Sequence, residues 1–318
     1  MSLSGRAIVA ILSLLLLCAV APAQTTFAAI TGTATDVSAA IVPDVTVVAR
    51  NVATGVQTTA KSNDEGVFTI PQLREGVYVV RATKTGFKEF VVQDINLVGR
   101  DYRRVDIVLQ VGSVDTAIEV QGGATLIETE TARISDTRDV AQLRDMPLNS
   151  RAIWAQLSLA PNVLQASAGS TIRFAGSRTN QSHWSLDGTT MSDGVSETQI
   201  GPLANYVESF QEVRIDSSSN TAEFGTLGQV TIITKGGTNT FHGSLFDYYS
   251  TPWFKARSPF APSRPTGIYH LPGGSAGGPV YIPKVYDGRN KTFVFGSFET
   301  FKGSVTTQLF TPTVPLTP

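Results

Sequence analysis

The sequence predicts a mainly-β chain with an N-terminal β-sandwich, a middle domain that mixes helices and strands, and a C-terminal set of membrane-facing strands. Three observations lead to this prediction. Strand-like runs recur about every ten residues up to residue 112. Two segments with helical spacing lie among strands between residues 124 and 237. The last 78 residues hold 15 of the chain's 27 aromatic side chains, which favours strands of a transmembrane barrel.

The chain begins with a predicted secretory signal, residues 1–23. Arg6 is the only charge before an apolar run from Ala7 to Val20. This run is too short to span a bilayer comfortably and suits the apolar region of a signal peptide. Small residues at Ala21 and Ala23 favour cleavage before Gln24. An uncleaved anchor and a buried core helix are the alternatives.

Composition narrows the function classes. The formal net charge is −1 and no basic stripe is present, so a nucleic-acid partner is not predicted. Cys18 is the only cysteine, and the large residue Leu17 before it argues against a lipoprotein box. Cleavage after Ala23 leaves no cysteine, so the exported chain depends on sheet packing rather than disulfides. Thiolate metal sites are excluded for the same reason.

Residues 24–112 are predicted to form the sandwich. Alternation marks half-buried strands: Val45, Val47 and Ala49 share one face, as do Ile107 and Leu109 further on. About seven such runs, divided by turn clusters, indicate a sandwich. The predicted strands are Ala28–Thr35, Asp44–Arg50, Gly55–Lys61, Val67–Ile70, Gly76–Thr83, Phe87–Ile95 and Tyr102–Val111.

A short β-prone segment with glycines on both sides, Val114–Val120, links the sandwich to the middle domain. Helical spacing predicts helices at Arg138–Arg144 and Ser150–Leu159, the second bounded by Pro147 and Pro161. The predicted strands of the middle domain are Ile172–Ala175, Ser182–Leu186, Val207–Ile215 and Gln229–Thr234. Residues 113–237 therefore form a linking segment and an α+β domain.

From residue 238 the chain is predicted to begin a transmembrane β-barrel, with an aromatic soluble sheet as the alternative. Strands are predicted at Phe241–Ser250, Gly278–Ile282 and Lys291–Phe301. A membrane barrel has to close, because lipid cannot satisfy free strand edges. About three strands cannot close one. The sequence is therefore expected to be a fragment, the product of a disrupted reading frame, or one piece of a split protein.

No enzyme chemistry, cofactor or metal site is predicted. Gly273–Gly277 satisfies G-x-S-x-G around Ser275, but Pro272 precedes it and a strand, not a helix, follows. His183, His242 and His270 lack metal-ligand spacing. His183, Ser185 and Asp187 alternate on one strand, which favours a polar face over a catalytic triad.

The sandwich sequence resembles a known domain. ITGTATD, VPDVTVVARNVATG and SNDEGVFTIPQLREGVYVVRATKTGF together resemble a carboxypeptidase regulatory-like domain. The resemblance implies a transthyretin-like sandwich, a fold that is also grouped with carbohydrate-binding-like domains. It implies no peptidase activity.

The remaining chain resembles TonB-dependent outer-membrane transporters of the Oar-like group, whose plug follows such a sandwich. The plug motifs are DMPLNSRAIW, LAPNV, FAGSRTNQSHWSLDG, VESFQEVRIDSSSNTAEFG and VTIITKGGTNTFHGSLF. YHLPGGSAGGPV and NKTFVFGSFETF resemble the first barrel strands. One departure is that the stretch after Gly225 is a couple of residues short of the family's glycine-rich segment.

The resemblance implies active uptake of a siderophore, glycan or peptide, with a TonB-type energy-coupling protein and outer-membrane lipid as partners. It implies an outer-membrane location, with the N-terminal domain in the periplasm. The segment that contacts TonB is predicted as Asp115, Thr116, Ala117, Ile118, Glu119 and Val120; a plain linker or a last sandwich strand is the alternative. Such a β-prone segment can add as a strand to a partner's sheet edge.

Four plug residues are candidates for facing the substrate: Arg178, Asn180, Trp184 and Asp187. A structural role in turns and lumen-facing hydrogen bonds is the alternative for all four. A rival function comes from a different class. The chain is then a periplasmic or surface module that binds a glycan or a protein and transports nothing.

Overall fold

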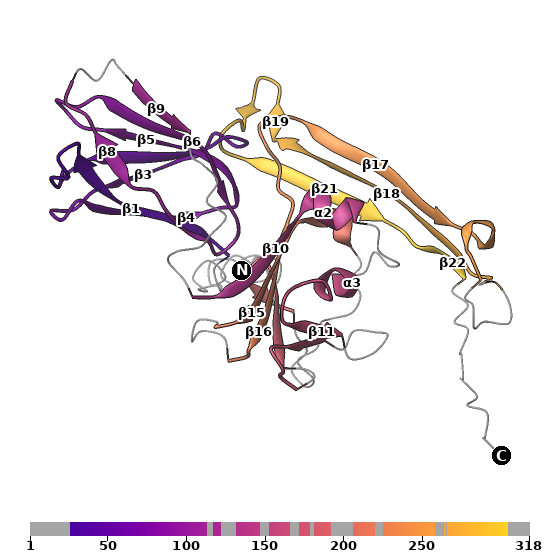
Figure 1. Ribbon diagram of the computed structural model, residues 1–318. Coiled ribbons are helices and arrows are strands. Elements are labelled where there is room, and N and C mark those ends of the chain that lie inside the picture. Colours follow the sequence, from indigo (N-terminus) through magenta and orange to yellow (C-terminus); the bar gives the residue numbers. More distant parts are fainter. Residues whose placement is uncertain are drawn as a thin grey trace, which may run out of the picture.

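The computed structural model shows a sandwich, a middle domain and a C-terminal sheet along the chain (Figure 1). It describes residues 26–112, 117–121, 132–146, 153–165, 172–178, 181–191, 206–219, 225–257, 264 and 266–304. The predicted signal, residues 1–23, lies outside the described residues. None of the helices in the described part of the chain is long and apolar enough to cross a membrane.

The N-terminal sandwich, residues 26–112 with the strand at 117–121, has two sheets. One sheet has the order β3-β2-β5-β6-β9, and in the other β1 pairs with β4, β7 and β8. The strands of the first sheet are β2 (Thr46–Asn51), β3 (Gln57–Lys61), β5 (Gly76–Thr83), β6 (Glu89–Leu97) and β9 (Ala117–Gln121). Those of the second are β1 (Ala28–Asp36), β4 (Val67–Leu73), β7 (Tyr102–Arg104) and β8 (Ile107–Leu109).

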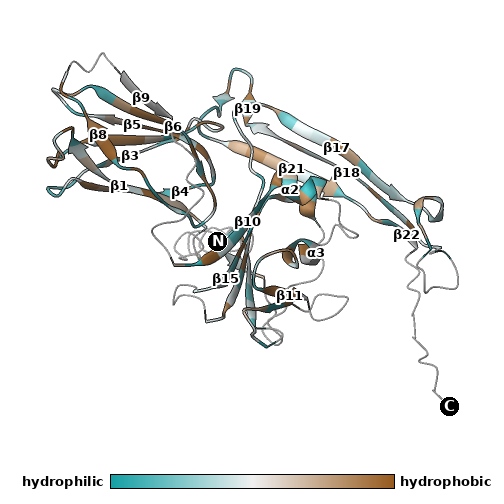
Figure 2. Ribbon diagram, in the orientation of Figure 1, coloured by the Kyte–Doolittle hydropathy of each residue, from teal (hydrophilic) through white to brown (hydrophobic). Residues whose placement is uncertain are grey.

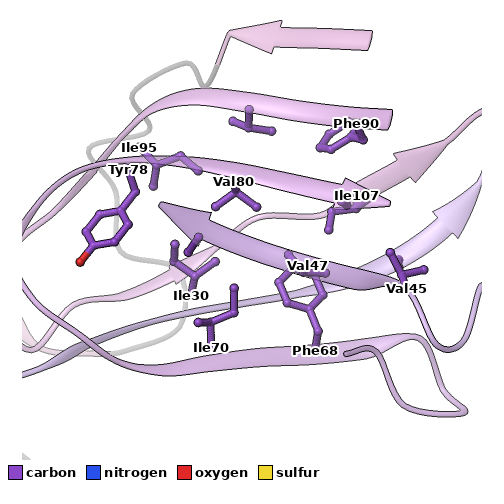
Figure 3. Close-up of a cluster of buried hydrophobic side chains, with 14 of the residues drawn as sticks. Ile30, Val45, Val47, Phe68, Ile70, Tyr78, Val80, Phe90, Ile95 and Ile107 are labelled. Carbon is purple, nitrogen blue, oxygen red and sulfur yellow. The ribbon is translucent and has the colours of Figure 1, made fainter. Parts of the chain in front are cut away.

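Alternating apolar residues from both sheets meet in one core (Figure 3). Val47 and Val80 come from one sheet, and Ile30, Phe68 and Ile70 from the other. These side chains are at most 1% exposed, and each such burial stabilises the fold by about 1.5–3 kcal/mol. The predicted sandwich is therefore confirmed, and its stability comes from sheet packing.

The predicted strand Tyr102–Val111 is instead two short strands, β7 and β8. Both run parallel to β1, and between them the backbone N–H of Val105 bonds to the Thr31 carbonyl at 2.8 Å. Gly32 permits this close approach, because a Cβ there would lie 1.9 Å from the Val105 carbonyl oxygen. The register with β1 is the same before and after the interruption, where the Thr33 N–H donates to the Asp106 side chain at 3.0 Å. The local alternation does not reveal this interruption.

The middle domain, residues 132–235, is a five-stranded sheet with two short helices. The sheet order is β10-β15-β16-β13-β14. Its strands are β10 (Ile134–Asp139), β13 (Ser182–Leu186), β14 (Thr189–Thr190), β15 (Phe210–Ser218) and β16 (Gly228–Thr234). The helices are α2 (Val140–Asp145) and α3 (Ile153–Leu157), with a 3-10 turn η3 (Val207–Ser209) and a small sheet of β11 (Val163–Gln165) and β12 (Ile172–Phe174).

The first predicted helix begins two residues later than expected, at Val140 instead of Arg138. Arg138 ends up in strand β10, and Asp139 caps the helix by accepting from the Gln142 N–H at 2.8 Å. The Gln142 side chain accepts in return from the Asp139 N–H, which completes a capping box. The second predicted helix, Ser150–Leu159, is described over Ile153–Leu157 and ends two residues earlier than expected, while residues 150–152 lie outside the described residues.

The C-terminal sheet, residues 241–304, is antiparallel with the order β17-β18-β21, and β22 also pairs with β18. Its strands are β17 (His242–Ser250), β18 (Ile268–Pro279), β21 (Phe293–Glu299) and β22 (Lys302–Ser304). A 3-10 turn η4 (Pro252–Phe254) follows β17, and a small hairpin of β19 (Tyr281–Ile282) and β20 (Tyr286–Asp287) joins β18 to β21.

The predicted strand Gly278–Ile282 is wrong in extent, because the strand occupies Ile268–Pro279 instead. Its glycines do not turn the chain but leave room for neighbouring rings. A Cβ at Gly273 would lie 2.3 Å from the Phe246 ring, and one at Gly278 would lie 2.4 Å from Phe241. Aromatic side chains of the neighbouring strand therefore occupy the space above this glycine-rich strand.

Side chains on the two faces of the C-terminal sheet differ in exposure. On the outer face Leu245, Phe298 and Val294 are 94%, 72% and 57% exposed. Figure 2 shows the apolar colouring that runs along β21. On the inner face Ser244, Phe246 and Phe295 are partly covered. Exposed apolar residues that alternate with covered ones are typical of a membrane-facing strand.

Candidate functional site

The predicted coupling segment, Asp115–Val120, forms the last strand of the sandwich sheet where the structure describes it. β9 runs parallel to β6, with Glu89 opposite Ala117, Val91 opposite Glu119 and Gln93 opposite Gln121. Asp115 and Thr116 lie outside the described residues. Both the coupling interpretation and the alternative of a last sandwich strand therefore apply to the same residues, Ala117–Val120.

The last residues of the sandwich lie next to the start of β6, which explains why the coupling segment that follows can pair with β6. The N–H of Lys88 donates to the Gln110 carbonyl at 2.8 Å, and that of Gly112 donates to the Gly86 carbonyl at 3.1 Å. Val111 also forms a β-bridge with Phe87. The chain thus leaves the sandwich beside β6, and the next described residues pair with it.

The sandwich is joined to the middle domain by a buried network of charged groups, called the junction below. Arg100, in the turn after β6, donates to Asp216 on β15 at 2.9 Å. Arg214 donates to the same Asp216 carboxylate at 3.0 Å and to the Gly99 carbonyl at 3.1 Å. Arg133 donates to the Arg100 carbonyl at 3.0 Å. The Arg214 and Asp216 side chains are fully buried.

Glu212 adds a titratable group to the junction. Its carboxylate accepts a hydrogen bond from the Gly99 N–H. Burial raises its pKa to about 7, with Glu75 contributing in the same direction, while the Gly99 hydrogen bond and Arg214 lower it. Gly99 permits the close approach, because a Cβ there would lie 2.2 Å from Ile233 and 2.9 Å from Glu212.

A second contact ties the sandwich to the C-terminal sheet. The Asn239 N–H donates to the Ala53 carbonyl at 3.0 Å, and the Asn239 side chain donates to the Thr54 carbonyl. Asn239 and Asn290 also bond to each other: the Asn290 N–H donates to Asn239 Oδ1 at 2.7 Å. A loop of the sandwich is therefore held against the turn before β21.

A cavity of about 780 Å³ lies where the three parts meet. Tyr78 and Glu75 of the sandwich, Lys235 of the middle domain and Phe293 of the C-terminal sheet are among the residues that line it. Burial raises the pKa of Glu75. Residues from all three parts therefore line one cavity.

The four predicted substrate-facing residues do not gather at one place. Arg178 is exposed before β13, and Asp187 follows the other end of this strand. At 3.4 Å per residue the five-residue strand keeps the two ends roughly 17 Å apart. Asn180 lies outside the described residues.

One of these four predictions is corrected, and the structural alternative accounts for a second. Trp184 is 2% exposed in the core of the middle domain and donates to Ser182 at 3.0 Å, so the prediction that it faces a substrate is wrong. Asp187 adopts a positive φ of 48° and accepts from the Thr234 N–H and hydroxyl at 2.9 and 2.7 Å. Asp187 therefore forms a turn, the structural alternative.

The remaining motifs contribute no reactive arrangement. Ser275 lies in the middle of β18 and its hydroxyl contacts that of Ser244 at 2.8 Å. It does not lie at the strand-to-helix turn that a nucleophile elbow requires. Among the residues that the structure describes, no cluster of acidic, histidine or cysteine side chains is arranged to hold a metal ion.

The junction was missed by the sequence reasoning. Glu212, Arg214 and Asp216 alternate with Val213 and Ile215, a pattern that normally indicates a solvent-facing side of a strand. Here that side is covered by the sandwich. The sequence signal that could have revealed the junction was three charged residues on a strand that the plug resemblance places inside the domain.

Known proteins resemble both ends of this architecture. A family model for a carboxypeptidase regulatory-like domain matches residues 29–110, and one for an outer membrane beta barrel domain matches residues 233–317. The chain is 26% identical over 213 residues to the TonB-dependent transporter Oar of Myxococcus xanthus. That alignment covers 64% of this chain and 20% of the relative, so the chain spans about a fifth of the relative's length.

Similarity to solved structures is weak. The siderophore receptor PirA from Acinetobacter baumannii aligns with 46% of this chain and 22% of its own, at 20% identity and a TM-score of 0.35. Hydroxyquinol 1,2-dioxygenase from Pseudomonas putida aligns with 29% of this chain and 59% of its own, at 10% identity and a TM-score of 0.24. Neither score carries an argument about fold or function.

Residues 29–110 are therefore similar to a carboxypeptidase regulatory-like domain and residues 233–317 to an outer membrane beta barrel domain, which places the chain in the outer membrane. Among proteins of that location, it is similar to a TonB-dependent transporter. These matches confirm the resemblance of the sandwich, the mainly-β fold class and the outer-membrane location.

Proposed function

We propose that this chain takes part in active uptake of a substrate across the outer membrane, driven by a TonB-type energy-coupling protein. The middle domain is the plug that fills the barrel lumen, and the sandwich lies in the periplasm. Residues Asp115–Val120 are the segment that the partner binds. The substrate is a siderophore, a glycan or a peptide.

The observation that carries this proposal is how the middle domain contacts the C-terminal sheet. Glu208 of the middle domain accepts from Lys235 and from Ser244 on β17, both at 3.4 Å. Ser244 lies on the inner face of the sheet, whereas Leu245 next to it is 94% exposed on the outer face. A sheet with one face toward a packed domain and an apolar face left open suits a plug inside a membrane barrel.

The position of the coupling segment in the sequence supports the same proposal. It lies after the sandwich and before β10, the first strand of the middle domain. A pull on the segment therefore acts on the plug through the chain that leads into β10. In the plug, β10 pairs with β15, the strand that carries the junction residues. The similarity to a TonB-dependent transporter points in the same direction.

Of the plug candidates, Arg178 and Asn180 remain for contact with the substrate. Arg178 is exposed at the end of β13 that lies away from Asp187. Thr234, whose N–H donates to Asp187, precedes Lys235, and Lys235 lines the same cavity as Glu75 of the sandwich. Arg178 therefore lies at the end of β13 farther from that cavity.

Substitutions at one position test the coupling role. Strand addition uses backbone N–H groups, so a proline removes binding while a side-chain truncation has a smaller effect. We expect Ile118→Pro to abolish binding of the purified chain to an immobilised TonB-type periplasmic domain, and Ile118→Ala to retain most of it. Equal binding by the Pro variant and the natural sequence would refute the proposal and favour the rival binding module.

A further inference from the structure

We propose that the sandwich stores the coupling segment: Ala117–Gln121 rests as a strand on β6, and the TonB-type partner has to take it from β6. This inference rests on the proposed function and adds how the segment is regulated. It follows from the pairing of β9 with β6 along Glu89–Gln93. Backbone groups that bond to β6 are not available to a partner until the strand leaves.

The sequence of β6 explains why the stored state is the resting state. Phe90, Val91 and Val92 are 6%, 5% and 6% exposed, so three consecutive residues of β6 are buried. Phe90 and Val92 belong to the sandwich core, whereas Val91 does not. Side chains on both faces of this part of β6 are therefore buried, and its backbone is paired with β5 on one edge and β9 on the other.

Without β9, the edge of β6 would be unpaired and could pair with another chain. Natural edge strands are protected by charges, prolines, bulges or a covering segment. The run Phe90–Val92 has no charge and no proline, and the irregularity in the β5–β6 pairing lies beyond it, opposite Tyr78–Val80. β9 provides the missing cover, so its departure exposes an unprotected edge and its return is favoured.

The short connection between the sandwich and β9 favours renewed pairing of β9 with β6. Gly112 is fixed beside Gly86, and only residues 113–116 separate it from β9. A short tether of this kind gives an effective concentration in the mM range, on the order of 10⁻³ M. A partner that needs the free segment then binds with an affinity lowered by the fraction of time that the segment is free.

A disulfide between the two strands tests the inference in the full chain. Gln93 and Gln121 are register partners, and Gln121 lies just outside the predicted contact segment. We expect Gln93→Cys/Gln121→Cys to cross-link on oxidation. The oxidised protein should bind a purified TonB-type periplasmic domain at least tenfold more weakly than the same protein after reduction.

A matched control lies at the opposite end of the same sheet. Val48 on β2 and Thr59 on β3 are register partners far along the strand order from β9. Val48→Cys/Thr59→Cys should bind the TonB-type domain equally well before and after reduction. Loss of binding in both oxidised proteins would overturn the inference, because the effect would then come from a general stiffening of the sandwich.

The outcomes separate this inference from the proposed function. A synthetic peptide of residues 113–123 should bind the TonB-type domain more tightly than the intact chain does. If the peptide does not bind, the proposed function fails. If it binds but the Gln93→Cys/Gln121→Cys pair does not cross-link, or if oxidation leaves binding unchanged or stronger, storage on β6 is wrong and the proposed function stands.

Discussion

Arg100 of the sandwich donates a hydrogen bond to Asp216 of the middle domain at 2.9 Å, and the two side chains are 6% and 0% exposed. The residues are 116 positions apart in the sequence. Asp216 also receives Arg214 from its own strand. One buried carboxylate thus balances two guanidinium groups across the boundary between the two domains.

Removal of this carboxylate should destabilise the chain strongly. In Asp216→Ala two buried guanidinium groups lose the carboxylate that both contact, and breaking a buried ion pair costs about 3–5 kcal/mol. Urea unfolding of the purified chain measures the loss. The control is Asp145→Ala, since Asp145 pairs with Arg144 on the surface and such a pair contributes little to stability. Similar small losses in both variants would contradict a structural role for the junction.

The junction should also make stability depend on pH. The pKa of Glu212 is raised from 4.5 to about 7, so between these values the unfolded state loses its proton while the folded state keeps it. Stability contributed by the protonated carboxyl is complete below pH 4.5 and is lost as the pH rises to 7, by about 3 kcal/mol in total.

Glu212→Gln removes this titration and keeps an acceptor for the Gly99 N–H. Urea midpoints between pH 4.5 and 7.5 should fall more steeply in the natural sequence than in the Gln variant. Other carboxylates and the histidines titrate in both proteins, so the difference between the two curves isolates Glu212. Parallel curves would mean that the Glu212 carboxyl is not shifted by burial.

Local patterns were sufficient to predict the sandwich because each of its strands is half buried. Val47 and Ala49 alternate with polar neighbours on β2, and the predicted range Asp44–Arg50 differs from the observed Thr46–Asn51 by two residues at most. The strand β18 was harder to predict, because glycines normally favour turns. Its glycines are explained by rings from β17, which a one-dimensional pattern does not show.

The junction and the position of the coupling strand depend on contacts between distant parts of the chain. Arg100 and Glu212 each look like ordinary surface charges in their own segment. Trp184 was predicted to lie in a plug loop near the substrate, yet it packs in the core of the middle domain. The sequence therefore led to a predicted coupling segment, but it did not show that Ala117–Gln121 pairs with β6.

Two glycines with opposite surroundings provide a test of the sandwich packing. A Cβ at Gly32 would lie 1.9 Å from the Val105 backbone oxygen, whereas one at Gly236 meets no atom of the described chain within 4 Å. Gly32→Ala should lower the stability of the sandwich by about 1–3 kcal/mol, because the backbone has to shift. Gly236→Ala should change it by less than about 0.5 kcal/mol. Thermal unfolding of both variants measures the difference, and equal melting temperatures would contradict the close approach of the Val105 carbonyl to Gly32.

The last prediction concerns contact between lipid and the outer face of the C-terminal sheet. Leu245 is 94% exposed on β17, and an arginine on the lipid face of a barrel strand costs about 2–4 kcal/mol at the bilayer midplane. Leu245→Arg should therefore reduce the amount of chain recovered in the outer-membrane fraction. Val285, 78% exposed in the turn between β19 and β20, is the matched control, because Val285→Arg places the same charge outside the strands. If both variants reach the membrane equally well, the exposed face of β17 does not contact lipid, and the apolar side chains on it need a protein partner instead.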